Sequence, residues 1–176
     1  MQYSFNEVPL DISKDISVRA NVDAIIYGTK DEAPRGIFAV LQTVLRDEKG
    51  SPIKSPFTYK LTGEGKNDNR GPHTTRTGYL CNEKLIRAIY KPATLMRADA
   101  TMSAIGMVAP EKDIFILSWR DEIKAQDVIV LIKTDDNGNI INPVTIEKEF
   151  IVSLVYPKKL DNGRVEFYTC IIEDQK

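Results

Sequence analysis

The second half of the chain consists of short apolar runs separated by turn residues. The runs are rich in β-branched and aromatic residues, and they span Leu85–Tyr90, Ile105–Ala109, Asp113–Arg120, Asp127–Ile132, Phe150–Tyr156 and Val165–Ile172. Runs of this length and composition predict strands. Tight turns are expected at Asn137-Gly138, where both residues accept positive φ angles, and within Pro157–Gly163, which connects the last two strands. Successive short strands joined by turns predict a mainly β fold, a small antiparallel β-barrel or sandwich.

The first half of the chain is less regular. Gly36–Leu45 predicts one more strand, with a helix as the alternative. Residues 20–27 fit either a short strand or a helical turn that ends at Gly28. Residues 1–18 carry scattered apolar side chains, and Pro9 interrupts any helix there. We therefore expect an extended N-terminal arm that packs on its own domain or on a neighbour.

A chain of 176 residues suits one compact domain with a sizeable core. We expect an arm at residues 1–18 and a single β-rich domain at residues 19–176 that contains a long loop at residues 50–78. The loop is rich in Gly, Pro, Asn and Asp, which are turn-forming residues. Loops of this length are uncommon in small domains, so we expect it to be functional or ordered by a partner. The only expected helix is Ala93–Ser103.

Residues suited to catalysis or metal binding are few and scattered. His73 is the single histidine, and Cys81 and Cys170 lie 89 positions apart. We expect both cysteines to be buried, inert thiols, with a disulfide as the alternative. The acidic residues Asp135 and Asp136 lack the spacing of a calcium loop and fit a hairpin turn. We therefore expect no catalytic site, no metal and no cofactor, and a protein that is not an enzyme.

The first residues lack the basic and apolar regions of a signal peptide, and the longest apolar run, Val128–Ile132, is far too short to span a membrane. We therefore expect a protein made and kept in the cytosol, with no membrane partner.

Charge is unevenly distributed along a chain whose formal net charge is only −1. Residues 54–97 contain nine basic and three acidic residues, whereas residues 99–149 contain ten acidic and five basic ones. Such segregation suits either of two roles: like copies that stack basic face on acidic face, or a basic loop presented to phosphates. The candidates for contact with phosphates or with another copy are Lys54, Lys60, Lys66, Arg70 and Arg76.

The order of these elements resembles a known family. A strand that ends before Pro92 is followed by a segment with Gly106, an Asp before an apolar strand (Asp127), a strand with a Val155-Tyr156 pair, a turn at Gly163 and a closing strand. From about residue 78 to residue 172, this order resembles the neck proteins of tailed bacteriophages, of the head-closure or head–tail connector (adaptor) family.

The resemblance implies a structural virion protein that forms a homo-oligomeric ring in the neck. Such a ring joins the portal to the tail and helps retain packaged DNA. The implied partners are a portal or adaptor ring and tail proteins, with non-specific contact to DNA, and the implied location is the virion neck, assembled in the host cytoplasm. Tyr3, Phe5 and Leu10 of the arm would contact an adjacent subunit. The alternative is a monomeric small β-barrel that binds nucleic acid or another protein.

Overall fold

The computed structural model describes residues 21–56, 73–92 and 112–174. Its strands are β1 (Ile37–Val44), β2 (His73–Thr74), β3 (Leu80–Lys91), β4 (Ile114–Ser118), β5 (Val128–Ile132), β6 (Ile146–Lys159) and β7 (Val165–Asp174). Residues 21–27 form a short helical segment, so the helical alternative holds there. The predicted mainly β fold is confirmed, and so is the strand at Gly36–Leu45, which is β1.

Several expectations concern residues outside the described ranges. They are the arm at residues 1–18, most of the loop at residues 50–78, the helix at Ala93–Ser103 and the strand at Ile105–Ala109.

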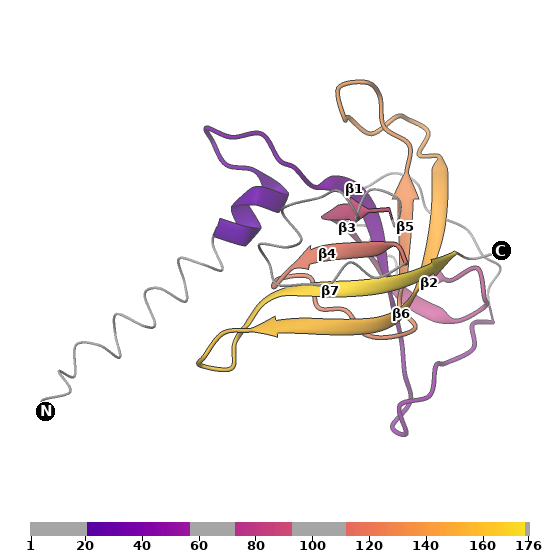
Figure 1. The fold of residues 1–176 in the computed structure, drawn as a ribbon. Coiled ribbons are helices and arrows are strands. Elements are labelled where there is room, and N and C mark those ends of the chain that lie inside the picture. Colours follow the sequence, from indigo (N-terminus) through magenta and orange to yellow (C-terminus); the bar gives the residue numbers. More distant parts are fainter. Residues whose placement is uncertain (1–20, 57–72, 93–111, 175–176) are drawn as a thin grey trace, which may run out of the picture.

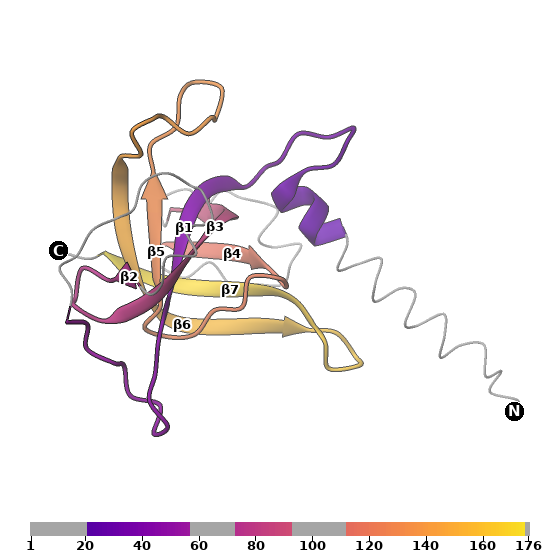
Figure 2. The ribbon, with the colours of Figure 1, turned by 180° about the vertical axis from the view of Figure 1, so that it is seen from behind.

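Six of the strands close into a barrel (Figures 1 and 2). The order around the barrel is β1-β5-β6-β7-β4-β3, and a long antiparallel pairing of β1 with β3 completes the circle. That pairing extends from Ile37 opposite Ala88 to Val44 opposite Cys81. Every pairing between strands is antiparallel, and the short β2 adds to the start of β3. Closure joins the two edges that an open sheet would leave without a partner.

The barrel interior is filled by alternate side chains of every barrel strand. Its centre includes Tyr90, Phe115 and Phe150, whose rings lie 4.9–5.6 Å apart. Around them pack aliphatic side chains such as Leu41 and Ile129, each almost fully buried. Tyr90 is the one polar ring of the three, and its hydroxyl donates to Asp113 at 2.8 Å. The polar end of this ring is thereby satisfied beside the apolar core.

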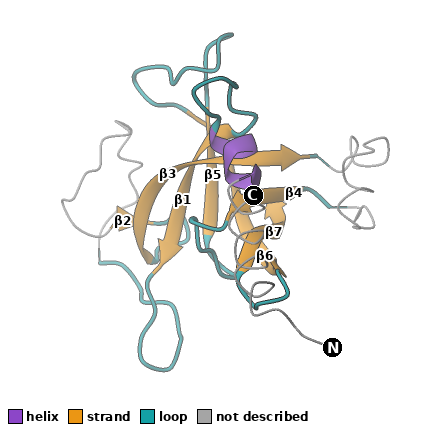
Figure 3. Cartoon of the chain, turned by 90° about the vertical axis from the view of Figure 1, so that its left-hand side faces the viewer, coloured by secondary structure: helices purple, strands orange, loops and turns teal. Residues whose placement is uncertain are grey.

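Strand β4 is buried on both faces, which explains why its sequence is apolar up to its last residue, Ser118. Its inner side chains join the barrel core, and its outer side chains Ile114 and Ile116 pack with Phe167 in a second cluster. Val22 of the helical segment lies against this cluster. Figure 3 shows the helical segment on the outside of the strands. The helix therefore shields part of the outer sheet face from water.

Four turns share one hydrogen-bond pattern, in which a glycine with positive φ is the fourth residue. The glycines are Gly50, Gly78, Gly138 and Gly163, with φ between 80° and 88°. In each turn the glycine N–H donates to the first residue's carbonyl, and the first residue's N–H donates to the carbonyl of the residue after the glycine. This is a type I turn followed by a bulge. The predicted tight turn at Asn137-Gly138 is confirmed, and Gly138 is its left-handed residue.

Pro157 lies inside β6, not in the connection after it as expected. It stands opposite Tyr168 of β7. A bulge at Ser153 interrupts the β6–β7 register, and from Leu154 onward the strand that pairs with β6 within the described residues is β7 alone. A proline is tolerated in such an edge position because its missing N–H would face away from the ladder.

Candidate interaction surface

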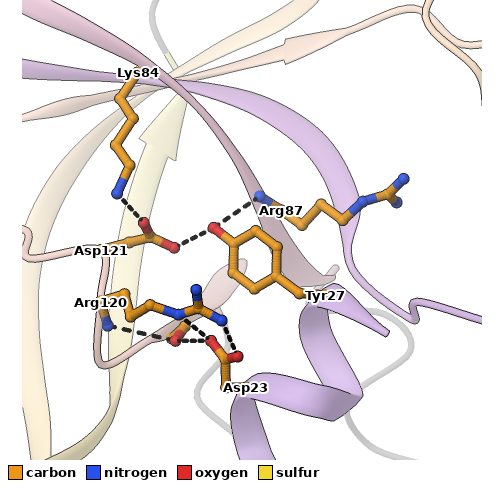
Figure 4. A network of polar contacts seen from close by, with 7 residues as sticks. Asp23, Tyr27, Lys84, Arg87, Arg120 and Asp121 are labelled. Carbon is orange, nitrogen blue, oxygen red and sulfur yellow. Dashed lines mark hydrogen bonds and ion pairs between the residues drawn. The ribbon is translucent and has the colours of Figure 1, made fainter. Parts of the chain in front are cut away.

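A buried carboxylate holds the helical segment against the barrel (Figure 4). Asp121 lies in the turn after β4 and is 1% exposed. One of its oxygens accepts a hydrogen bond from the Tyr27 hydroxyl, and the other pairs with Lys84 Nζ at 2.7 Å. Burial and then the neighbouring Asp121 raise the pKa of Tyr27 well above its ordinary value. Asp121 thus links the helical segment, β3 and the β4–β5 loop.

A second set of contacts lies beside the first. Asp23 pairs with the Arg120 guanidinium through both carboxylate oxygens, and Ser118 Oγ donates to it at 2.7 Å. Partial burial would raise the pKa of Asp23, but the hydrogen bonds from Arg120 and Ser118 and the charge of Arg120 outweigh it, and the pKa is lowered. We call Asp23, Tyr27, Lys84, Arg120 and Asp121 the helix latch.

A pocket of about 430 Å³ opens next to the helix latch. Its lining combines the end of β1 and the residues after it with Lys84 and the β4–β5 loop. Asp127 lies in this lining, is 1% exposed, and accepts hydrogen bonds from the backbone N–H groups of Val44 at 3.0 Å and Lys124 at 2.8 Å. Burial raises the pKa of Asp127, although these N–H groups oppose the effect. Asp127, which is the Asp before the apolar strand in the sequence pattern, therefore connects the β4–β5 loop to β1 by hydrogen bonds.

The structure places two of the five predicted basic contact residues. Lys54 is exposed, and its backbone forms a bridge with Tyr79. Arg76 lies 3.4 Å from Glu149, whose side chain is only 2% exposed. The other three candidates, Lys60, Lys66 and Arg70, lie outside the described residues, as do Tyr3, Phe5 and Leu10 of the arm.

The uneven charge along the sequence is partly neutralised within the folded chain. Arg76 and Lys84 belong to the basic segment, residues 54–97, and their partners Glu149 and Asp121 belong to the acidic segment, residues 99–149. Arg87 is also engaged, because its guanidinium lies 3.7 Å from the centre of the Phe38 ring and donates to the Gly36 carbonyl. These cations stabilise the fold, and the contact roles predicted for Lys54, Lys60, Lys66 and Arg70 stay predictions.

Replacing Arg76 with serine should destabilise the protein, since Glu149 would lose the Arg76 guanidinium in a site that water hardly reaches. Because Arg76 is itself more than half exposed, we expect a loss of about 1–2 kcal/mol in the free energy of unfolding. Lys54→Ser is the matched control, with an expected change within about 0.5 kcal/mol. Urea denaturation measures both, and equal changes in the two variants would contradict a structural role for the Arg76–Glu149 pair.

The two cysteines and the acidic residue Asp135 have structural roles. Cys81 and Cys170 are free and buried, as expected, and burial raises the pKa of Cys81 to about 12. Asp135 accepts the N–H groups of Asn137 and Asn139, which is the predicted hairpin turn. Within residues 21–56, 73–92 and 112–174, no group of three or more His, Cys, Asp or Glu side chains could hold a metal. None of the described helices is long and apolar enough to cross a membrane.

The outer face of β4, β7 and β6 changes from buried to exposed across the strands. Two rows of paired residues cross these strands from β4 through β7 to β6. The first row is Ile114, Ile171 and Leu154, and the second is Ile116, Thr169 and Tyr156. Exposure rises from 0% and 5% on β4 to 49% for Leu154 and 51% for Tyr156 on β6. Large apolar side chains that cluster on a surface mark interaction sites. We call Leu154 and Tyr156 the β6 patch.

Sequence reasoning identified strand positions but missed both the helix latch and the β6 patch. Asp23 and Tyr27 lie 94–97 positions from their partners in the sequence, so no local motif connects them. The Val155-Tyr156 pair was a signal for the β6 patch, since Val155 packs against the core and its neighbour Tyr156 is exposed.

Comparisons of the chain with protein-family models, curated proteins and solved structures found no match.

Proposed function

We propose that this chain is a structural virion protein of a tailed bacteriophage. It acts as the subunit of a ring in the neck that joins the head, through its portal, to the tail and helps retain packaged DNA. In this role it is not an enzyme. It assembles in the host cytoplasm, and its partners are its own copies, a portal or adaptor ring and tail proteins.

The observation that carries the proposal is the β6 patch. Leu154 and Tyr156 are half exposed on the outer face of β6, whereas Ile114, Ile116 and Phe167 on the outer face of the adjoining strands are buried. A ring subunit needs surfaces of this kind, because it must contact neighbouring copies while its barrel keeps a fixed shape. Contact with a neighbouring copy would remove these two apolar side chains from water, which is favourable.

The resemblance noted in the sequence supports the same role. Asp127, the Val155-Tyr156 pair and the Gly163 turn belong to β5, β6 and β7 or to the loops beside them, and these three strands are neighbours in the barrel. These three features of the pattern therefore lie in one continuous part of the fold. Its tyrosine is half exposed and belongs to the β6 patch.

Assembly with neck partners tests the proposal. The wild-type chain, alone or mixed with portal and tail rings of the same phage, should form ring-shaped particles visible by electron microscopy. The double variant Leu154→Ser/Tyr156→Ser should remain folded and lose these particles. Ile37→Ser is the matched control, because Ile37 is 43% exposed on β1, away from the β6 patch.

Two results would contradict the proposal. One is a wild-type chain that stays a monomer with every ring and binds DNA at moderate salt, which would favour the alternative of a nucleic-acid-binding barrel. The other is a Leu154→Ser/Tyr156→Ser variant that assembles as well as Ile37→Ser.

A further inference from the structure

We propose that the β6 patch docks on the β5–β6 loop of a second copy of the chain, in a head-to-tail contact. This inference rests on the proposed function and specifies which two surfaces form the ring.

The β6 patch is bordered by positive charge. Leu154, Tyr156 and Lys158 stand opposite alternate residues of β7, so they share the outer face of β6, and Lys159 follows at the end of the strand. Residues 154–159 contain these two lysines and no acidic residue. Both lysines are exposed, and neither is in an ion pair with another described residue. The surface is therefore apolar at its centre and basic at one side.

The β5–β6 loop has the complementary character. Its tip, residues 135–140, carries Asp135 and Asp136 with no basic residue, and Ile141 is 41% exposed. Hydrogen bonds from the backbone N–H groups of Asn139 and Asn137 orient the Asp135 carboxylate in the turn and lower its pKa. The two carboxylates at the tip complement the two lysines beside the β6 patch. Ile141 lies below the tip, where its N–H donates to the carbonyl of the exposed Lys133, and it offers an apolar side chain to Leu154 and Tyr156 of the second copy.

The two surfaces lie at opposite ends of the same strand. The acidic tip precedes β6, and the basic side of the β6 patch is near its end, so they are separated by a strand of 14 residues with a contour of about 45 Å. Figure 1 shows the β5–β6 loop and the β6–β7 turn leaving the barrel in different directions. One copy therefore cannot satisfy its own two surfaces. Contact between two different surfaces repeats from copy to copy and closes into a ring when the rotation allows it.

Disulfide trapping tests this contact directly, because the native thiols are buried. The double variant Tyr156→Cys/Ile141→Cys should form a ladder of covalent oligomers under a mild oxidant. A mixture of the two single variants should form only mixed dimers, identified by a mass tag on one variant. Wild-type protein is the control and should stay uncrosslinked.

The pattern of products separates the possible failures. Dimers from Tyr156→Cys alone would show a symmetric contact and overturn the inference. Wild-type rings without any ladder from the double variant would also overturn it, while the proposed function would stand. Absence of both ladder and rings, alone and with portal and tail rings, would overturn the inference and the proposed function together.

Charge exchange gives a second measurement. Lys158→Glu/Lys159→Glu and Asp136→Lys should each weaken self-association about tenfold or more, as seen by sedimentation, and the combined variant should recover most of the loss. Lys30→Glu/Lys49→Glu is the matched control at exposed positions elsewhere and should leave association unchanged. Failure of the combined variant to recover would overturn the proposed pairing.

Discussion

Replacing Gly28 with alanine is expected to detach the helical segment from the barrel. Gly28 ends that segment with a φ of +79°, a conformation that strains a residue with a Cβ. A Cβ there would also lie 2.7 Å from Pro34 N and 2.9 Å from the Glu32 carbonyl oxygen. Both are backbone atoms and cannot rotate away. We expect the variant to lose about 2–4 kcal/mol in the free energy of unfolding.

Gly50→Ala provides the control for this prediction. Gly50 has a nearly identical φ of +82°, but a Cβ there would meet no other atom within 4 Å. The expected loss is about 1–2 kcal/mol, from backbone strain alone. Urea denaturation gives the two free energies, and hydrogen exchange of residues 21–36 reports whether the helical segment has separated. Equal losses with unchanged exchange would show that the connection after the helix tolerates a side chain.

The second large effect is expected at Asp121. Asp121→Ala removes the buried acceptor of the Tyr27 hydroxyl and the partner of Lys84. Lys84 can turn toward water because its side chain is more than half exposed, whereas the half-buried Tyr27 hydroxyl would lose its acceptor at the barrel surface. We expect a loss of about 2–3 kcal/mol in the free energy of unfolding and faster hydrogen exchange in residues 21–27.

Two further variants make the Asp121 result specific. Asp121→Asn keeps an acceptor for Tyr27 and loses the charge opposite Lys84, so its loss should be smaller than that of Asp121→Ala. Asp31→Ala, in the exposed connection after the helix, should change stability by less than about 0.5 kcal/mol. An Asp121→Ala protein as stable as Asp31→Ala would show that the helix latch does not hold the segment.

The local elements could be predicted from the sequence because their signals are short-range. Strand β5 is a continuous run of β-branched and aliphatic residues, and β1 is a similar run with few polar interruptions. Glycines at the tips of the hairpins supply the positive φ that those turns need. Each signal lies within a few residues, so it does not depend on what the rest of the chain does.

The helix latch and the β6 patch could not be predicted from such short-range signals. Tyr27 and Asp121 are far apart in the sequence, and their contact exists only because the helical segment packs on the barrel beside the turn after β4. Pro157 was expected in a connection, because a proline interrupts a strand that has neighbours on both sides. The pairing of β5 with β6 ends at Ile151, so Pro157 stands opposite β7 alone and fits inside β6.

Charge shows the same division between local and long-range information. The basic and acidic segments are visible in the sequence, but the folded chain pairs Arg76 with Glu149 and Lys84 with Asp121, so these charges are not free for a partner. Lys158 and Lys159 are exposed in the folded chain, although residues 150–176, to which they belong, have a net charge of zero. Composition counts charges, whereas recognition depends on which of them remain exposed after folding.

Strand positions, turns and the mainly β character of this protein follow from local composition and periodicity, which act over a few residues. Barrel closure through β1 and β3, the docking of the helical segment and the exposure of Leu154 and Tyr156 were decided by tertiary structure. The physical reason is that a side chain's partner and its exposure depend on segments brought together from distant parts of the chain, and that arrangement is fixed only when the whole core packs.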